Sequence, residues 1–462
     1  MLKIKRMVES MVLDIINPAT KQVYKSIQTS SVDDVNAAVE KAKVAFKQWS
    51  AKSHEERTTA LHNVANAIEA VAPELAEIIT AEQGKPLFLA QFEVGGAVGW
   101  THYNADLKLD PEVLEDSDER RVEVHRMPVG VVASITPWNW PLMIAIWHIM
   151  PALRAGNSVV IKPSSLTPIN TLRLVEIINE HTMPNLVQCV IGEKEVGEPL
   201  VSHPDVKKVV FTGSTQVGKR IASLVAGDLK KVTLELGGND AGIVLENANI
   251  DKIAEKIFMT SFVNMGQTCA CLKRLYVHRS KYEALCNALV KIAAAQVVGN
   301  GMKEGVTFGP VQNVNQYEKV KAMIADARES GAEVIAAELP SGLDGYFIAP
   351  TIIKNPQHNI DVVCHEQFGP VLPVIPYDDL NDVMSKAIHE EFALGGSVWG
   401  EPCDELDWVV SQLDSGTVWV NNHAEVLPHV PFGGNKSSGL GVEFGMEGLL
   451  ENTVRKVVNR AK

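Results

Sequence analysis

Alternating strand and helix patterns between positions 129 and 225 constrain the fold of this chain more than any other feature. Short apolar runs bounded by Gly and Pro are separated by segments with helical spacing of apolar residues. Strands are expected at 129–135, 158–161, 187–191 and 208–211, and helices at 141–153, 168–180 and 216–225. Strands joined by helices of this length form βαβ units, so we predict a parallel sheet with a nucleotide site at the carboxyl ends of its strands.

The segments on either side extend the same architecture. Helical spacing is evident at 33–49 and 55–79, and the polar segment 106–126 alternates like an exposed hairpin. After Gly238 a second α/β pattern begins, with helices expected at 250–265, 282–297 and 315–330 and strands at 275–277, 371–375 and 417–420. A chain of 462 residues is too long for one core, so we expect two or three packed domains.

The composition limits the classes of partner and compartment. A formal net charge of −13 at pH 7 disfavours nucleic acid and anionic membrane as partners. The most apolar long stretch, 141–153, is too short to span a bilayer, and Glu9 and Asp14 interrupt any signal peptide. The six cysteines form no CxxC pair, and Cys269 with Cys271 alone would make a weak metal site. We therefore expect a soluble, cytoplasmic protein with free thiols and no metal.

Cys269 and Glu235 are the residues most suited to catalysis. Cys269 lies in the run MGQTCAC, and Glu235 begins the run ELGG, 34 residues upstream. A thiolate attacks carbonyl carbon and a carboxylate activates water, so the pair can make and then hydrolyse a thioester. A single cysteine is more often inert core, but the glycines around both residues favour a ligand site. His148 and His423 are the nearest histidines and are expected to be packing or capping residues, so activation of the thiol is assigned to backbone amides or a cofactor's positive ring.

Three further segments carry groups suited to a nucleotide or a reacting carbonyl, and each also has a simpler interpretation. Asn139, in TPWNWP, can direct its amide N–H at an oxyanion or can cap a Pro-containing turn. Lys162 stands at the end of an expected strand, where a lysine can hold a ribose or a phosphate but is commonly just solvated. The run FTGSTQVG joins a strand to a helix through a glycine turn, which suits a pyrophosphate but is not the GxGxxG fingerprint.

Taken together and in this order, these segments resemble the aldehyde dehydrogenase superfamily. The resemblance extends over nearly the whole chain, from INPAT at 16–20 to the tail, and includes HEQFGP at 365–370, GTVWVNN at 416–422 and PFGGNKSSG at 431–439. No single piece is decisive, but several in the right order, with the 34-residue spacing from Glu235 to Cys269, are very specific.

The resemblance implies a role for each matching residue. Cys269 is the implied nucleophile, Glu235 the base for thioester hydrolysis, and Asn139 with the Cys269 backbone amide the oxyanion hole. The implied cofactor is NAD, with NADP possible, and its implied contacts are Thr136, Pro137, Trp138, Lys162, Ser165, Gly213, Ser214, Gly218, Leu236, Gly237, Glu366 and Phe368. The implied substrate tunnel is formed by Trp140, Ile144, Trp147, Val263, Thr268 and Val426.

The same resemblance implies an α/β fold with two Rossmann-like domains and a small oligomerisation element. The dinucleotide-binding domain is expected at 1–105 and 127–237, and the catalytic domain at 238–446. The oligomerisation element comprises the hairpin 106–126 and a C-terminal strand within 447–462, which we expect to pair across subunits in a homodimer or homotetramer.

Two positions depart from the family pattern. Ser165 stands where NAD-preferring members often carry a carboxylate, which would repel a 2′-phosphate. Because Ser165 is neutral and no arginine stands nearby in sequence, we expect NAD with measurable use of NADP. His148 stands where many members have lysine after Trp147, which puts in question a proton relay through that lysine and Glu443.

We interpret the chain as a hydrolytic, NAD(P)-dependent aldehyde dehydrogenase acting on a small-molecule aldehyde. One alternative is a CoA-acylating semialdehyde dehydrogenase, against which Glu235 argues because a base is needed only when water is the acceptor. A second is a catalytically silent protein of the same fold, against which the joint presence of the implied residues argues. The tunnel residues are apolar or neutral and no arginine immediately flanks Cys269, which favours an uncharged, medium-sized or aromatic aldehyde.

Overall fold

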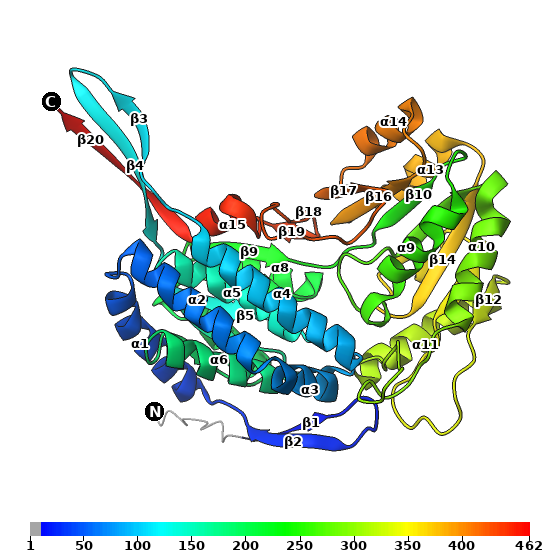
Figure 1. Cartoon of the computed structure of the whole chain (residues 1–462), viewed down its shortest axis with the longest axis horizontal. Coiled ribbons are helices and arrows are strands. Elements are labelled where there is room, and N and C mark those ends of the chain that lie inside the picture. Colours follow the sequence, from blue (N-terminus) through cyan, green and yellow to red (C-terminus); the bar gives the residue numbers. More distant parts are fainter. Residues whose placement is uncertain (1–10) are drawn as a thin grey trace, which may run out of the picture.

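The computed structural model describes residues 11–462, so the N-terminal decapeptide, where no signal peptide is expected, lies outside it. A six-stranded sheet in the order β19-β9-β8-β5-β6-β7 organises the first lobe (Figure 1). Strands β5 to β9 are parallel, and β19 returns from far along the chain to pair antiparallel with β9, placing Gly439 opposite Glu235. The strands are β5 Val131–Ile135, β6 Ser158–Lys162, β7 Val187–Cys189, β8 Val206–Thr212, β9 Lys231–Glu235 and β19 Gly439–Leu440.

The predicted βαβ pattern of this lobe is confirmed. The helices that follow its strands are α5 Pro141–Arg154, α6 Ile169–His181, α7 Lys194–Ser202 and α8 Thr215–Ala226. The sequence pattern missed α7, and the strand expected at 187–191 ends at Cys189. The parallel strands β5, β6 and β8 end at one edge of the sheet, so the loops after them meet there.

Four helices precede this sheet: α1 Val32–Trp49, α2 His54–Ala70, α3 Ala72–Gln83 and α4 Leu87–Asp106. The prediction of a single helix at 55–79 is wrong, because the helix ends before Val71 and a new helix, α3, begins with Pro73 in its first turn. Proline suits a first turn because its missing N–H would be unpaired there anyway. The apolar faces of α2, α3 and α4 pack with α5 around one buried core.

A seven-stranded sheet organises the second lobe, in the order β12-β13-β14-β11-β10-β16-β17. Its strands are β10 Ala241–Val244, β11 Arg274–His278, β12 Glu333–Ala336, β13 Thr351–Lys354, β14 Val371–Tyr377, β16 Gly395–Trp399 and β17 Thr417–Val420. All pair in parallel except β12, which is antiparallel to β13. The three strands expected here are therefore confirmed.

The helices of the second lobe are α9 Ile250–Phe262, α10 Arg279–Ala294, α11 Val314–Glu329, α12 Asp361–Cys364, α13 Leu380–Ala387 and α14 Asp404–Gln412. The helix expected at 250–265 is too long, because Asn264 and Met265 take left-handed backbone conformations inside the short 3₁₀ segment η1, Val263–Gly266. The helix expected at 282–297 begins three residues earlier and ends at Ala294.

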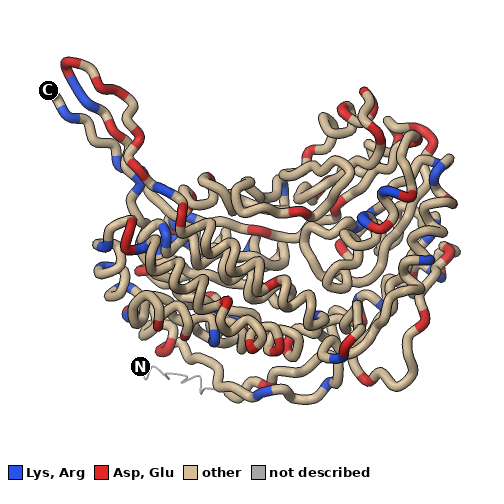
Figure 2. Tube along the Cα trace, viewed as in Figure 1, with Lys and Arg blue, Asp and Glu red and all other residues tan. Residues whose placement is uncertain are grey.

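A three-stranded sheet, in the order β20-β4-β3, projects from the first lobe, and we call it the arm (Figure 1). Its strands are β3 Glu112–Asp116, β4 Arg120–Pro128 and β20 Thr453–Ala461, and α15 Gly445–Glu451 leads into β20. The tail pairs with the hairpin of its own chain, which corrects the expectation that the two meet only across subunits. The hairpin also starts later than expected, because α4 extends to Asp106. The arm carries both signs of charge (Figure 2).

A hairpin of β1 Val12–Ile16 and β2 Val23–Gln28 runs along one edge from the first lobe to the second (Figure 1). Its two ends are tied by backbone bonds, from Ser30 to Ile191 and from Tyr346 to Pro18. A smaller pair, β15 Phe392–Ala393 with β18 Asn435–Lys436, lies near β19. Within residues 11–462, no helix is both long and apolar enough to cross a membrane.

Candidate active site

Asn139 and the segment before Cys269 meet where the two lobes join. Asn139 lies in the turn between β5 and α5, and Cys269 in the loop between η1 and β11. The Asn139 side-chain amide donates to the Gln267 carbonyl at 2.9 Å, two residues before the cysteine. Asn139 is buried and Cys269 is half-buried. An amide fixed this close to the thiol is suited to donating to an oxyanion on a carbon bound to sulfur.

A buried ion pair holds the Asn139 turn. The Lys85 ammonium lies 2.5 Å from the Glu93 carboxylate and donates to the Asn139 carbonyl at 2.9 Å. It also lies 3.6 Å from the centre of the Trp140 ring. The other oxygen of Glu93 accepts from the backbone N–H groups of Leu142 and Met143, in the first turn of α5. Sequence patterns did not single out Lys85 or Glu93, because the turn that they hold lies far along the chain. Asn139 is 54 residues from Lys85, and Leu142 is 49 residues from Glu93.

The loop that carries Cys269 is shaped by left-handed backbone. Asn264, Met265 and Gly266 have φ values of 53°, 58° and 68° in succession. A Cβ on Gly266 would lie 2.2 Å from the Gly369 carbonyl oxygen, so only glycine fits. This close approach brings the loop 366–369 against the segment before Cys269. The Asn264 side chain also donates to the Asn139 carbonyl at 2.8 Å, which ties the loop to the oxyanion turn.

Glu235 ends β9 and is buried without a hydrogen-bond partner for either carboxylate oxygen among residues 11–462. Burial and the nearby Glu443 carboxylate raise the pKa of Glu235 well above its usual range. A carboxylate with a raised pKa is a stronger base than an exposed one and accepts a proton from water more readily. The free oxygens of Glu235 are therefore available to a water or a substrate.

Burial also raises the pKa of the Cys269 thiol, and the carboxylates of Glu235, Glu366 and Asp240 raise it further. Lys273 opposes them. With this balance the thiol is neutral at pH 7, so it needs further positive charge or hydrogen bonds before it attacks a carbonyl.

A cavity of about 680 Å³ lies at the carboxyl ends of β5, β6 and β8. Seven of the residues expected to contact the cofactor line it: Thr136, Pro137, Trp138, Lys162, Ser165, Gly213 and Ser214. Ser214 precedes α8 and makes no side-chain cap, so the first backbone N–H groups of α8 face outward unbonded by that side chain. A helix start of this kind suits a pyrophosphate, and the cavity therefore fits a dinucleotide.

The other five expected cofactor residues lie beside this cavity rather than on its wall. Gly218 packs against Leu236, and a Cβ there would lie 2.4 Å from a Leu236 methyl group. The Gly238 backbone N–H donates to the Glu366 carboxylate at 3.4 Å, while the Trp138 and Phe368 rings meet edge to face at 5.4 Å. A Cβ on Gly237 would approach Glu366 to 2.8 Å. Trp138 thus links the cavity to a second group of residues near Cys269.

The expected tunnel residues gather around Cys269. Trp140 and Ile144 share a buried cluster with Met143, against which Trp147 and Val263 pack. Trp147, Val426 and Cys269 pack together against a second cluster, whose buried members are Ala270, Leu394, Trp419, Phe432 and Phe444. The Trp140 indole N–H donates to Thr268 at 2.8 Å, next to the cysteine. Trp147 and Val426 therefore share a cluster with the thiol, Trp140 bonds to the residue before it, and Ile144 and Val263 pack with Trp140 and Trp147.

Comparison with known proteins decides the family. The family model described as aldehyde dehydrogenase family matches residues 6–458. This chain belongs to the aldehyde dehydrogenase family. It is 39% identical over 460 residues to phenylacetaldehyde dehydrogenase of Pseudomonas fluorescens, with 96% of this chain and 91% of that protein covered.

Solved structures of this family share its fold. The crystal structure of an E. coli NADP-dependent enzyme matches with a TM-score of 0.94 at 34% identity, covering 98% of this chain and 95% of that one. The NAD⁺ complex of aldehyde dehydrogenase from Bacillus cereus matches with a TM-score of 0.93 at 33% identity, covering 98% and 93%. The aldehyde dehydrogenase fold, the enzyme class and the pairing with NAD or NADP expected from sequence are confirmed.

Within this aldehyde dehydrogenase, sequence patterns missed several aromatic rings near the thiol. Trp100, from α4, packs on Trp147 and Phe444 with ring centres 5.7 and 5.8 Å apart. Trp147 and Phe444 meet at 4.7 Å, and Phe432 and Phe444 at 5.9 Å. No local signal marks Trp100, because its position in the middle of a helix is shared by many core residues.

His148 is more than a packing residue in this enzyme. Its ring is buried, with Nδ1 2.9 Å from the Ser134 hydroxyl and Nε2 2.9 Å from the Thr212 hydroxyl. Nε2 also lies 3.1 Å from the Glu443 carboxylate, whose charge raises the pKa of Glu235. Thr212 is the β8 neighbour of Glu235 in the sheet. The histidine is therefore one contact away from the expected base.

His423 occupies a different position. It is buried against the Trp419 ring at 4.9 Å, with its Nε2 3.5 Å from the Asp240 carboxylate. Asp240 also accepts from the Gly395 backbone N–H at 3.1 Å. This arrangement agrees with the packing role expected for His423.

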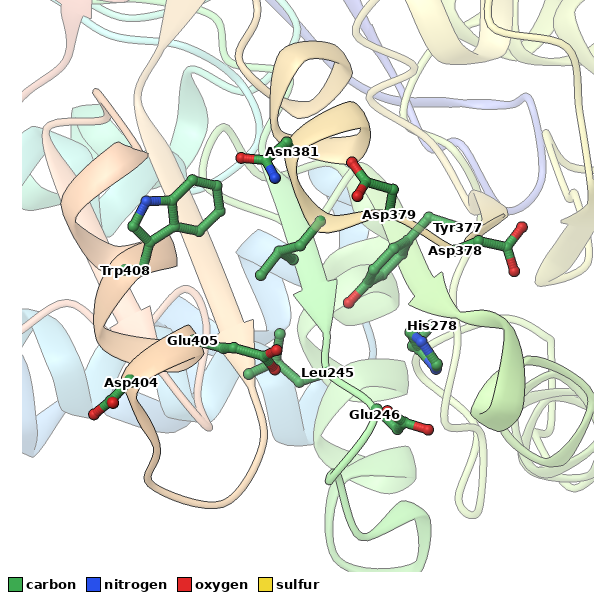
Figure 3. Close-up of a pocket in the computed structure, with 11 residues that line it drawn as sticks. Leu245, Glu246, His278, Tyr377, Asp378, Asp379, Asn381, Asp404, Glu405 and Trp408 are labelled. Atoms are coloured by element: carbon green, nitrogen blue, oxygen red, sulfur yellow. The ribbon is translucent and has the colours of Figure 1, made fainter.

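A second cavity, of about 620 Å³, lies at the carboxyl ends of β10, β11 and β14 in the second lobe (Figure 3). Its position resembles that of the first cavity, but carboxylates line it: Glu246, Asp378, Asp379, Asp404 and Glu405. Carboxylates repel phosphate groups, so this cavity does not suit a dinucleotide. None of the residues expected at the active site lines it.

Proposed function

We propose that this chain oxidises an aldehyde to a carboxylic acid with NAD(P), using Cys269 as nucleophile and Glu235 as the base that hydrolyses the thioester. The observation that carries the proposal is the buried Glu235 carboxylate, free of partners in the described chain and grouped with the thiol. Burying a carboxylate without a hydrogen-bond partner costs folding free energy, so a carboxylate kept in this state supports a functional role.

The chemistry begins with a carbon–sulfur bond. The Cys269 thiol gives up its proton to water, and the thiolate attacks the aldehyde carbon, whose oxygen becomes an oxyanion. The Asn139 side-chain amide and the Cys269 backbone N–H stabilise this charge. Bound in the cavity of the first lobe, NAD(P) would supply the acceptor for the hydride that leaves this carbon with its electron pair as the carbonyl forms again. A thioester on Cys269 remains.

Glu235 acts in the second half of the reaction. It takes a proton from water, whose oxygen attacks the thioester carbon while the carbon–sulfur bond breaks. The carboxylic acid departs and the sulfur is restored. The raised pKa of Glu235 suits this role, because a carboxylate whose pKa is raised by burial and by Glu443 is a stronger base toward water.

The cavity in the first lobe fits the adenosine end of the cofactor. We assign Lys162 and Ser165 to the adenosine ribose, Gly213 and Ser214 to the pyrophosphate, and Glu366 to the nicotinamide ribose. The supporting features are the free start of α8 and the contact between Trp138 and Phe368, which joins the cavity to the residues near the thiol. We accordingly assign 1–105 and 127–237 to the dinucleotide domain and 238–446 to the catalytic domain, with β19 as a strand exchanged between them.

The aromatic rings around Cys269 support an uncharged, aromatic aldehyde as substrate. Trp100, Trp147 and Phe444 contact one another beside the thiol. Of the nearby cations, Lys85 is neutralised by Glu93, and the Lys273 ammonium donates to the Gly266 carbonyl at 2.8 Å. Aromatic faces bind apolar rings well, whereas a carboxylate-bearing aldehyde would need an unpaired cation. The name of the relative from Pseudomonas fluorescens, phenylacetaldehyde dehydrogenase, agrees with this choice.

A second candidate function, acyl transfer to CoA, is disfavoured by Glu235. A panel of aldehydes supplied with NAD or NADP, with and without CoA, tests the choice through absorbance of the reduced nicotinamide. We expect turnover without CoA and the highest kcat/KM for phenyl-substituted aldehydes. Turnover only when CoA is present would overturn the hydrolytic proposal.

We also propose that the arm makes the enzyme a homodimer or homotetramer. Its outer strands β3 and β20 each have one unpaired edge. Several apolar side chains on it are exposed, among them Val113, Leu114, Val454 and Val457. Open strand edges with exposed apolar side chains are typical of surfaces that pair with another chain.

A further inference from the structure

The pocket around Lys162 is built from two loops that Lys162 ties together. The Lys162 ammonium, at the end of β6, donates to the carbonyls of Pro163 at 3.1 Å and Gly192 at 2.9 Å. Gly192 lies in the loop between β7 and α7. Lys162 is largely buried, so both bonds are shielded from water. They fix the residue that follows Gly192, which is Glu193, beside the end of β6.

Glu193 reaches back to Ser165 across this pocket. The Ser165 hydroxyl donates to the Glu193 carboxylate, and both residues line the cavity assigned to the cofactor. Ser165 is buried, whereas Glu193 is exposed to the cavity side. Ser165 itself is neutral, but the Glu193 carboxylate bonded to it places a negative charge at this part of the cavity.

The cations of this pocket are already engaged. Arg220 donates to Glu198 at 2.9 Å, and the Lys194 ammonium lies 3.8 Å from the same carboxylate. Both cations line the cavity. In a dinucleotide fold, a carboxylate at this end of the second strand accepts from the ribose 2′-hydroxyl and repels a 2′-phosphate, whereas a free arginine binds that phosphate.

We propose that Glu193, held by Ser165, is the residue that makes this enzyme prefer an unphosphorylated adenosine ribose and so NAD over NADP. The inference rests on the proposed cofactor site and refines it. It sharpens the expectation of NAD with measurable use of NADP, which was drawn from the neutral Ser165 and the lack of an arginine nearby in the sequence. Without Glu193, the Ser165 hydroxyl would be free to meet a 2′-phosphate, and no carboxylate bonded to it would repel that phosphate.

Titration calorimetry with fragments of the two cofactors tests this without catalysis. ADP-ribose and 2′-phospho-ADP-ribose are titrated into the full-length wild type, Glu193→Gln and Glu195→Gln. Glu195 is the matched control, because it is an exposed carboxylate two residues further on that does not line the cavity. The wild type should bind ADP-ribose more tightly than its phosphorylated form.

In Glu193→Gln the ratio of the two dissociation constants should shift toward 2′-phospho-ADP-ribose by about tenfold or more, since one close like charge has been removed. ADP-ribose should still bind, which shows that the pocket is intact. In Glu195→Gln the ratio should stay as in the wild type. A second variant, Ser165→Ala, removes the hydroxyl that holds Glu193 and should shift the ratio in the same direction by a smaller factor.

An unchanged ratio in Glu193→Gln, or an equal shift in Glu195→Gln, would overturn the role of Glu193 while leaving the cofactor site in place. Failure of both fragments to bind the wild type would overturn the site assignment itself, and the inference with it. The two failures are therefore distinguishable in one set of titrations.

Discussion

His148 and Glu443 meet inside the core, with Nε2 of the imidazole 3.1 Å from a carboxylate oxygen. The pair joins α5 to the segment that precedes α15, and Glu443 in turn raises the pKa of Glu235. The relay questioned from sequence, because histidine replaces lysine, thus keeps a side chain in contact with Glu443 at the same position.

Replacing His148 by lysine tests this coupling. In His148→Lys, a fixed cation beside Glu443 offsets the negative charge that Glu443 exerts on Glu235, so the pKa of Glu235 falls. Because Glu235 must be ionised to act as a base, the rising limb of kcat against pH should move to lower pH. His148→Gln, which adds no charge, should not move the limb in that direction. If His148→Lys leaves the limb where the wild type has it, Glu443 does not transmit charge to Glu235.

Alanine substitutions at Cys269 and Cys271 test which of the two neighbouring cysteines is the nucleophile. Cys269→Ala should abolish aldehyde oxidation and leave binding of ADP-ribose near normal, since no carbon–sulfur bond can form. Cys271→Ala should keep most activity, because that thiol is fully buried and lies 3.9 Å from the Val263 carbonyl. Steady-state rates and calorimetry measure both properties. An inactive Cys271→Ala together with an active Cys269→Ala would reverse the assignment.

Removing the Lys85–Glu93 ion pair, which holds the turn that carries Asn139, should lower kcat. Lys85→Met alone leaves Glu93 buried and unpaired, which costs about 3–5 kcal/mol of folding free energy. The double variant Lys85→Met with Glu93→Gln removes both charges and should fold more stably than the single one. Because Asn139 loses a hydrogen bond to its carbonyl, the double variant should lose about ten- to a hundredfold in kcat with a smaller change in KM.

Thermal unfolding and steady-state kinetics together check this account of the ion pair. A double variant that folds well and keeps the wild-type kcat would show that Lys85 and Glu93 serve stability alone. Asn139→Ala provides the reference, since it removes the proposed oxyanion donor directly.

The arm predicts the assembly. Val457→Glu places a charge at an exposed apolar position on β20, which is 62% exposed within one chain. Sedimentation velocity should show a dimer or tetramer for the wild type and a shift toward smaller species for the variant. Lys456→Glu, a neighbouring change on the same strand, controls for charge alone. A wild type that sediments as a fully active monomer at micromolar concentration would contradict the assembly proposed for the arm.

The parallel strands were predictable because burial on both faces makes their sequences continuously apolar, as in β5 and β6. The proposed catalytic pair could be picked out from the sequence because Glu235 and Cys269 lie near glycines and are 34 residues apart. The break at Val71 was not predictable, because the apolar spacing continues through it. The left-handed turn at Asn264 was hidden for the same reason, since nothing in its side chain forbids a helix.

Contacts between segments far apart in the chain could not be predicted from the sequence. Lys85 and Asn139 are 54 residues apart, and Ser165 and Glu193 are 28 residues apart, so only the folded chain brings each pair together. Both contacts enter the proposals made above, one by holding the turn that carries Asn139 and the other by placing a carboxylate in the cavity assigned to the cofactor. Patterns within one element predict that element, whereas pairings of this kind depend on how the loops at a sheet edge are arranged.

The central claim is that Glu235 hydrolyses a thioester formed on Cys269, and rapid mixing of Glu235→Gln with NAD⁺ and phenylacetaldehyde tests it most directly. The variant should release a burst of about one reduced cofactor per active site and then turn over slowly, because hydride transfer precedes hydrolysis. Added hydroxylamine, a nucleophile that attacks thioesters without a base, should restore part of the turnover. A variant that shows no burst, or that turns over as fast as the wild type, would contradict the account.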